Sequence, residues 1–232
     1  WRKDYFPYYK QNRKKARSES SLDWNELFDI LTKIQNELEE NFPYKVLKIE
    51  GAEADDIIAI ISNRISSTPN LYEDILIISG DKDFIQLHEK NNVKQYSPTL
   101  KKFVVDDNPE QYKFEHIIRG DKGDGVPNVL SVDDTFTEGI RQKPMRAKKI
   151  QEWYTAKDDS QLMDMMGQET YRNYCRNKSV IDLDYIPEDI TQDINDKYNS
   201  QTNKNKGKVL TYLIEKRCNM LIDSVADFLP AT

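Results

Sequence analysis

A short apolar run that ends in two acidic residues constrains the fold of this chain more than any other feature. Residues 75–78 read Ile-Leu-Ile-Ile, which is typical of a strand covered on both faces, and Ser79-Gly80 ends the run. Asp81 and Asp83 follow at once. Because an open parallel sheet collects its ligands beyond the carboxyl ends of its strands, both carboxylates are expected at that edge. Two unpaired carboxylates would repel each other, so the pattern indicates either a divalent cation between them or an exposed acidic turn.

A second group of acids follows another predicted strand. Residues 44–49 alternate between polar and apolar side chains and predict a strand, after which Glu-Ala-Asp-Asp at 53–56 leads into an apolar helix. Glu53, Asp55 and Asp56 therefore belong to the first helical turn, where the helix dipole and the free N–H groups stabilise carboxylates. Capping alone accounts for one or two acids. Three acids beyond a strand end favour metal binding.

A third acidic group lies in a glycine-rich loop, Gly-Asp-Lys-Gly-Asp-Gly-Val-Pro at 120–127. Its glycines allow a close approach of backbone amides to a phosphate. Asp121 and Asp124 are three residues apart, which permits joint ligation of a metal ion, although a solvated loop would look similar. Further pairs of adjacent acids, such as Asp106-Asp107, occur outside such contexts, and we interpret that pair as turn residues.

The distribution of charge is as informative as the net charge of −6. Residues 1–17 carry a net charge of +6, with cations interleaved with aromatic side chains, which leaves −12 for the rest of the chain. This segment is either an arm that contacts phosphates and bases or an amphipathic helix with a packed aromatic face. An acidic body with a basic arm suits an enzyme that binds metal ions and also contacts phosphates.

The remaining pattern predicts a core-facing helix near residues 22–41, two short strands at 92–97 and 101–105, and a helix at 110–119. From residue 143 onward the chain predicts helices, interrupted by a polar loop at 199–208. His88 and His116 share no acid–base pattern and are interpreted as structural. There is no run of about 20 apolar residues, no zinc spacing and no P-loop, so we expect a soluble protein with reduced cysteines. Trp1 in place of an initiator methionine indicates a fragment or a trimmed chain.

Ligands that are all oxygen select Mg²⁺ or Mn²⁺ rather than zinc. The three acidic groups supply enough carboxylates for two ions, which suggests phosphoryl chemistry with metals about 3.5–4 Å apart. The basic aromatic segment makes a nucleic acid the expected substrate. A phosphatase built on Asp81-x-Asp83 is the rival enzyme class, although it would not need that segment.

The motifs E-A-D-D at 53–56, S-G-D-K-D-F-I-Q-L at 79–87 and G-D-K-G-D-G-V-P at 120–127 resemble, in this order, the structure-specific 5′ nucleases. Residues 171–187 most resemble the phage ribonuclease H members of that family. The resemblance implies an α/β fold, with a Rossmann-like (PIN-like) open sheet flanked by helices. Residues 1–118 would form the nuclease core, with an arch at 1–20, and residues 119–232 a helix–loop–helix region that binds duplex DNA.

The resemblance also implies a site of two Mg²⁺ ions, with Mn²⁺ as a substitute. The first ion would be held by Glu53, Asp55, Asp56 and Asp81, and the second by Asp83, Asp121 and Asp124. Asp55, Asp81, Asp83, Lys10 and Arg13 would be catalytic. Nucleic acid would be bound by Arg2, Lys3, Lys10, Arg13, Lys14, Gly120, Lys122, Gly123, Gly125, Lys143, Arg146 and Lys148.

The implied activity is 5′→3′ exonuclease or flap endonuclease cleavage that removes RNA primers during lagging-strand synthesis. The expected partners are branched or flapped DNA, RNA–DNA hybrid, and a single-stranded-DNA-binding protein or sliding clamp. The protein would be a monomer in the cytoplasm of a bacterial host, away from membranes. The family's further aspartates, on a strand before the arch, have no counterpart here, and the hairpin glycines expected after Pro127 are missing. The alternative is therefore an incomplete nuclease that binds branched DNA without cutting it.

Overall fold

The computed structural model describes residues 1–201 and 206–229, and the chain forms two compact units. The first unit comprises residues 1–19 and 51–191, and the second comprises residues 20–50 and 192–232. The expected α/β class is confirmed. The boundary predicted between residues 118 and 119 lies inside the first unit, at the end of helix α5 (Pro109–Arg119).

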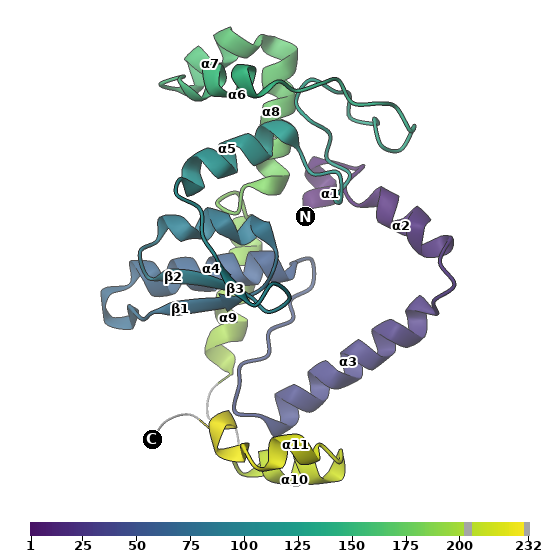
Figure 1. Cartoon of the computed structure of the whole chain (residues 1–232), viewed down its shortest axis with the longest axis vertical. Helices are drawn as coiled ribbons and strands as arrows, with labels where there is room; N and C mark the ends of the chain where they lie inside the picture. The colour runs from purple at the N-terminus through teal and green to yellow at the C-terminus, as the bar shows by residue number, and fades with distance from the viewer. Residues whose placement is uncertain (202–205, 230–232) are drawn as a thin grey trace. The chain divides into compact units, whose positions relative to one another are not determined.

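A three-stranded mixed sheet lies in the first unit (Figure 1). Strand β1 (Ile75–Ile78) pairs in parallel with β2 (Val93–Ser97), and β2 pairs antiparallel with β3 (Lys102–Val104). The strands predicted at 92–97 and 101–105 are thus present. The prediction that β1 is covered on both faces is wrong, because Leu76 and Ile78 are 54% and 68% exposed and only Ile77 is buried.

The buried face of the sheet packs against helix α4 (Ala54–Ser67) and the 3₁₀ helix η2 (Lys82–Glu89). Ala59, Ile77, Phe84, Leu87 and Val93 form this core. A short 3₁₀ turn, η1 (Pro69–Leu71), connects α4 to β1. The carboxyl end of β1 therefore leads directly into η2, beside the amino end of α4.

The helices that follow the sheet build a second core in the same unit (Figure 1). Helix α5 packs against α8 (Gln168–Ile181), and α7 (Asp159–Met166) packs against α8 and α6 (Ala147–Tyr154). The N-terminal segment forms α1 (Arg2–Tyr5) and α2 (Gln11–Ser18), and its Phe6 and Tyr9 are buried in this core. The packed aromatic face, one of the two alternatives for this segment, is therefore present.

The second unit contains α3 (Trp24–Asn41) and a small cluster of Phe42, Val209 and Leu213. Helix α9 (Glu188–Ser200) begins in the first unit and ends in the second, followed by η3 (Lys206–Lys208), α10 (Val209–Glu215), α11 (Asn219–Ile222) and η4 (Val225–Phe228). Part of the loop predicted at 199–208 lies outside the described residues. None of the described helices is long and apolar enough to span a membrane.

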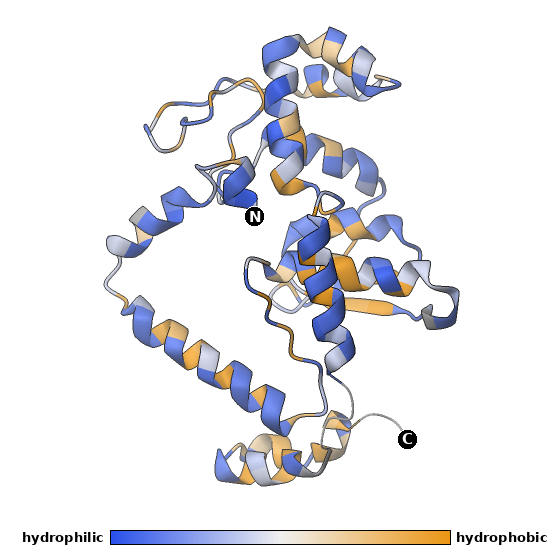
Figure 2. Ribbon diagram, turned by 180° about the vertical axis from the view of Figure 1, so that it is seen from behind, coloured by the Kyte–Doolittle hydropathy of each residue, from blue (hydrophilic) through white to orange (hydrophobic). Residues whose placement is uncertain are grey.

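Two predictions for the second unit are wrong. Helix α3 forms as predicted and shows an apolar stripe (Figure 2), but no residue of it is buried, and Ile30 and Leu31 are 47% and 52% exposed. Residues 44–49 form no strand, because no neighbouring strand pairs with them. Instead the backbone of Val46 bonds the side chain of Gln201, with N–O distances of 2.9 and 2.6 Å.

Candidate metal centre and nucleic-acid interface

Three carboxylates from two elements meet at the carboxyl end of β1. Asp55 comes from the first turn of α4, Asp81 is the N-cap of η2, and Asp83 lies in the first turn of η2. One oxygen of each lies within 4.8 Å of the others. Burial and then the charges of Asp81, Asp83 and Glu53 raise the pKa of Asp55 to about 6. The carboxylates of Asp55, Asp81 and Asp83 thus repel one another, and a bound cation would relieve this repulsion.

A second group shares Asp83 with the first. Asp83, His116 and Asp121 each place one donor atom within 4.8 Å of the others. His116 Nε2 lies 3.2 Å from Asp83 Oδ1 and 4.0 Å from Asp121 Oδ2. Burial lowers the pKa of His116, but the close contact with Asp83 and the charges of Asp83, Asp121 and Asp81 together outweigh it and leave that pKa raised. Because Asp83 belongs to both groups, the arrangement fits two cations with one carboxylate between them.

The turn that presents Asp81 and Asp83 is attached to β2 by one buried amide. Gln95 is 1% exposed, and its Nε2 donates to the carbonyl oxygens of Ser79 and Asp81 at 2.9 and 2.5 Å. Its Oε1 lies 3.1 Å from His88 Nε2, which satisfies the other end of the amide. Within the turn, Asp81 Oδ1 accepts from the Asp83 N–H at 3.1 Å. These bonds fix the path of the backbone between the strand and the two carboxylates.

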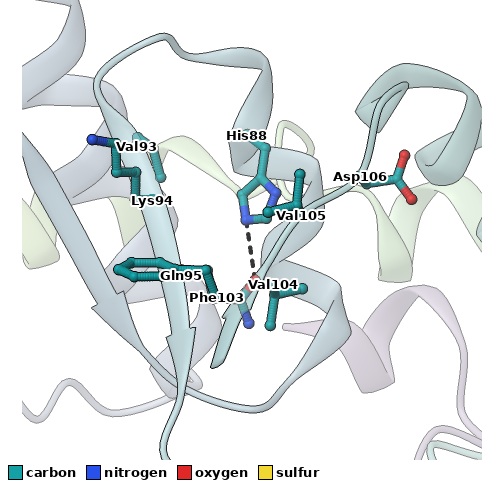
Figure 3. A pocket seen from close by; sticks show the side chains of 8 residues that line it. All are labelled: His88, Val93, Lys94, Gln95, Phe103, Val104, Val105 and Asp106. Atoms are coloured by element: carbon teal, nitrogen blue, oxygen red, sulfur yellow. Dashed lines mark hydrogen bonds between the residues drawn. The ribbon is translucent and has the colours of Figure 1, made fainter. Parts of the chain in front are cut away.

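His88 and Gln95 also line a pocket of about 550 Å³ beside β2 and β3 (Figure 3). The pocket wall is otherwise formed by Val93, Lys94, Phe103, Val104, Val105 and Asp106. Among the residues that line this pocket, Asp106 is the one with a carboxylate, so the pocket offers no pair of carboxylates for a further metal ion. Its His88–Gln95 hydrogen bond is the connection to the turn described above.

Two further predicted ligands, Glu53 and Asp124, lie beside the centre but are neutralised by cations of the N-terminal segment. Lys10 Nζ pairs with Glu53 and lies 3.5 Å from Asp124 Oδ2, while Arg13 pairs with Asp124 Oδ1. The Tyr9 hydroxyl lies 3.0 Å from Glu53 Oε2 and 2.8 Å from Asp124 Oδ2. Burial raises the pKa of Asp124, against the lowering effect of Lys10, Tyr9 and Arg13. The centre thus has one side whose carboxylates pair with lysine and arginine, and another side, formed by Asp55, Asp81 and Asp83, for which the described residues show no such pair.

Asp56 and Arg2 are placed differently from their predicted roles as metal ligand and nucleic-acid contact. Asp56 is fully buried and accepts from Arg2 Nη1 and Nη2 at 3.0 and 2.7 Å, from Trp1 Nε1 at 3.1 Å, and from the Glu53 N–H at 2.9 Å. Arg2 is 6% exposed and also donates to the Val180 carbonyl. Both side chains are therefore buried and engaged with each other inside the protein.

Two family models together match most of this chain. A model of the 5′-3′ exonuclease N-terminal resolvase-like domain matches residues 1–116, and a model of the T4 RNase H C-terminal domain matches residues 107–228. Ribonuclease H of Enterobacteria phage T4 is 37% identical over 233 residues, which covers 98% of this chain and 75% of that protein. The chain belongs to the 5′-3′ exonuclease family.

A bacterial 5′-3′ exonuclease shares less of its length with this chain. The 5′-3′ exonuclease of Buchnera aphidicola subsp. Acyrthosiphon pisum is 32% identical over 141 residues, covering 57% of this chain and 45% of that protein. Among solved structures, the phage T5 flap endonuclease in a complex with DNA and metal ions matches with a TM-score of 0.61 at 21% identity, covering 87% of this chain and 80% of that chain. At this identity the structural match supports the fold.

The predicted nucleic-acid contacts of this family member divide into exposed and engaged side chains. Seven of the cationic side chains are exposed, namely Lys3, Arg13, Lys14, Lys122, Lys143, Arg146 and Lys148. The loop that carries Gly120, Gly123 and Gly125 lies against α2, because Asn12 Nδ2 donates to the Lys122 carbonyl at 3.0 Å and Arg13 Nε to the Gly123 carbonyl at 3.2 Å. Arg13 remains 50% exposed despite its carboxylate partner. The loop and the arm thus form one continuous surface.

Sequence reasoning missed three residues of this site in the 5′-3′ exonuclease family fold. His116 was interpreted as structural, yet it lies five residues before Asp121 on the helix that leads into the acidic loop. Gln95 could have been noticed as a polar residue at an inward position between Val93 and Ser97 of β2. The sequence predicts base stacking or packing for Tyr9. No local pattern indicates that its hydroxyl reaches the carboxylates of Glu53 and Asp124.

Proposed function

We propose that this chain is a divalent-metal-dependent nuclease that hydrolyses phosphodiesters at 5′ ends or flaps of branched DNA and of RNA–DNA hybrids. The observation that carries the proposal is the pair of donor groups that share Asp83, next to exposed and cation-rich residues. All-carboxylate ligation at Asp55, Asp81 and Asp83 fits Mg²⁺, with Mn²⁺ as a substitute. When bound, two such ions supply Lewis-acid activation of a water molecule and of the leaving 3′ oxygen.

The side chains of this chain have three roles in such a reaction: they bind the ions, orient the backbone and bind phosphate. Asp55, Asp81, Asp83 and Asp121 hold the ions, and the buried Asp56 orients the first turn of α4 through its bond to the Glu53 N–H. Lys10 and Arg13 exchange their carboxylate partners for substrate phosphates. That exchange requires the loss of ion pairs to Glu53 and Asp124. A substrate that enters therefore frees the carboxylates of Glu53 and Asp124. As a result, phosphate binding and metal binding strengthen each other.

The duplex part of the substrate lies along the exposed cations. Lys3 and Lys14 contact the strand near the 5′ end, and Lys122, Lys143, Arg146 and Lys148 contact the duplex backbone. Contacts of this kind position the DNA without reading its sequence, and they weaken as salt concentration rises. The resemblance to ribonuclease H of phage T4 supports primer removal in a replisome, with a single-stranded-DNA-binding protein or sliding clamp as partner, in the cytoplasm of a bacterial host.

The test is cleavage of a 5′-labelled flapped duplex in Mg²⁺ by the unaltered chain and by the double variant Asp81→Asn, Asp83→Asn. Asp107→Asn is the matched control, because Asp107 is an exposed acid of the turn after β3 and not part of either donor group. Cleavage near the junction is expected from the chain and from the control, and not from the double variant. Equal cleavage by all three proteins would refute the assignment.

A second function, binding of branched DNA without cutting, is favoured by the uncovered face of β1. Leu76 and Ile78 are exposed at the edge of the described sheet, so an additional strand would be stabilised there. In that case the chain binds the flapped duplex in a salt-sensitive manner, and cleavage requires a complementing polypeptide. Cleavage by the chain alone would exclude this function.

A further inference from the structure

His116 is the one described histidine that faces the acidic centre. It lies in the last turn of α5, and its Nε2 approaches Asp83 Oδ1 at 3.2 Å and Asp121 Oδ2 at 4.0 Å. The two carboxylates come from different parts of the chain, η2 and the loop after α5, so the histidine lies where those parts meet. Its donor atom and theirs all lie within 4.8 Å of one another, which is close enough for a single ion to contact all three.

The imidazole packs against its own helix. Its ring stacks on that of Tyr112, one helical turn earlier, with centroids 6.1 Å apart and an interplanar angle of 16°. The next two residues, Ile117 and Ile118, are buried and anchor this end of α5. Within the described residues, the buried Nε2 atom forms no bond of acceptable hydrogen-bond geometry, even with the nearby Asp83 oxygen. A buried polar atom without a hydrogen bond calls for an explanation.

We propose that His116 is a ligand of the second metal ion, bound through Nε2 beside Asp83 and Asp121. The inference rests on the proposed two-ion nuclease and adds a nitrogen donor to one of its positions. The group of Asp55, Asp81 and Asp83 remains all-oxygen, which suits Mg²⁺. Imidazole nitrogen instead favours Mn²⁺, Fe²⁺, Co²⁺ or Zn²⁺ over Mg²⁺. The two positions therefore differ in the class of ion that they prefer.

A different role for His116 is to hold the Asp83 carboxylate from outside the coordination sphere. Such a partner changes metal affinity without touching the ion. A loss of metal affinity in a His116 variant would therefore fit both direct ligation and this indirect role. The experiment needs a signal that arises from direct nitrogen coordination alone.

The experiment is electron spin echo spectroscopy of bound Mn²⁺ in protein that carries ¹⁵N only in histidine. The chain has two histidines, His88 and His116, so each variant serves as the control for the other. We expect a directly coordinated ¹⁵N signal in the unaltered protein, loss of that signal in His116→Gln, and its retention in His88→Gln. Circular dichroism checks that both variants fold, and the spectrum of the unaltered protein tests the inference without any variant. The preference for Mn²⁺ over Mg²⁺, measured by calorimetry, is expected to fall in His116→Gln, because the variant has no imidazole nitrogen at this position.

The outcomes separate this inference from the proposed function. Mn²⁺ bound without a nitrogen signal, or with a signal that survives His116→Gln, overturns the inference, even if the protein cuts flapped DNA in Mg²⁺. A nitrogen signal that only His116→Gln removes supports it, even if no cutting occurs and the nuclease proposal fails. Absence of any Mn²⁺ binding overturns the inference as well.

Discussion

The buried pair of Arg2 and Asp56 leads to a prediction about stability that also separates structural from metal-binding acids. Asp56 is fully buried and receives four donors, two of which come from the guanidinium of Arg2. Arg2→Met keeps much of the side-chain volume but leaves the carboxylate with two neutral donors. Breaking a buried pair in this way costs about 3–5 kcal/mol, because the remaining charge is uncompensated.

The assay is urea unfolding followed by circular dichroism, with calorimetric titration of Mg²⁺ under native conditions. We expect Arg2→Met to lower the free energy of unfolding by about 3–5 kcal/mol. The double variant Arg2→Met, Asp56→Asn should recover part of this loss, since asparagine is neutral and still offers an oxygen to the Glu53 N–H. In conditions where the variants remain folded, Mg²⁺ affinity should change little. A loss below about 1 kcal/mol, typical of an exposed pair, would show that the pair is not buried as described.

Three other changes follow from the same structure. Gln95→Leu removes both donors to the turn before Asp83, so Mg²⁺ affinity by calorimetry should fall roughly 10- to 100-fold, and unchanged affinity would contradict the positioning role. Burial raises the pKa of Asp133, but two arginines of α8 outweigh this and leave it below its ordinary value. Asp133→Asn should therefore destabilise the protein by about 1 kcal/mol at pH 7, given that the carboxylate is one-third exposed. The difference from wild type should shrink as pH falls past about 3.9, the unfolded-state pKa, and should vanish below the lower folded-state pKa. Gly120→Ala should lower stability by more than about 1 kcal/mol in thermal unfolding, because φ is +67° and the new Cβ would lie 2.4 Å from the Val126 carbonyl; an unchanged transition would refute this.

The parts of the site that sequence reasoning located are those with local signals. The apolar run at 75–78 predicts a strand. The acids that follow it directly in sequence must then lie at the carboxyl end of that strand. The acids at 53–56 likewise occupy the N-cap and first turn of α4, because the apolar run that follows them forms this helix. Local patterns thus decide which backbone segments reach the centre.

The orientation of individual side chains depends on partners that are distant in sequence. Asp55 and Asp56 are adjacent, yet one faces the centre and the other faces Arg2, 54 residues earlier. Successive side chains of a helix point about 100° apart, so Asp55 and Asp56 face different surroundings. The position of the Arg2 guanidinium decides that Asp56 is the buried one. His116 is a similar case, because its role depends on how the end of α5 meets η2.

The two wrong predictions for the second unit have the same origin. The spacing of apolar residues predicts that α3 is an amphipathic helix, and it is one. Periodicity does not say whether another element covers the apolar face, nor whether the alternating residues 44–49 find a strand to pair with. A strand exists only as part of a ladder, so its prediction from one segment depends on segments elsewhere in the chain.

The bond from Arg2 to the Val180 carbonyl has a consequence for how this protein folds. It joins residues 178 apart, and the same guanidinium anchors the helix turn that carries the acids of the centre. Contacts of such long range form late, since the entropy of closing the intervening loop is paid first. During synthesis this bond therefore cannot form until Val180 has left the ribosome. We expect Arg2 to lack this anchor in any nascent chain that ends before Val180.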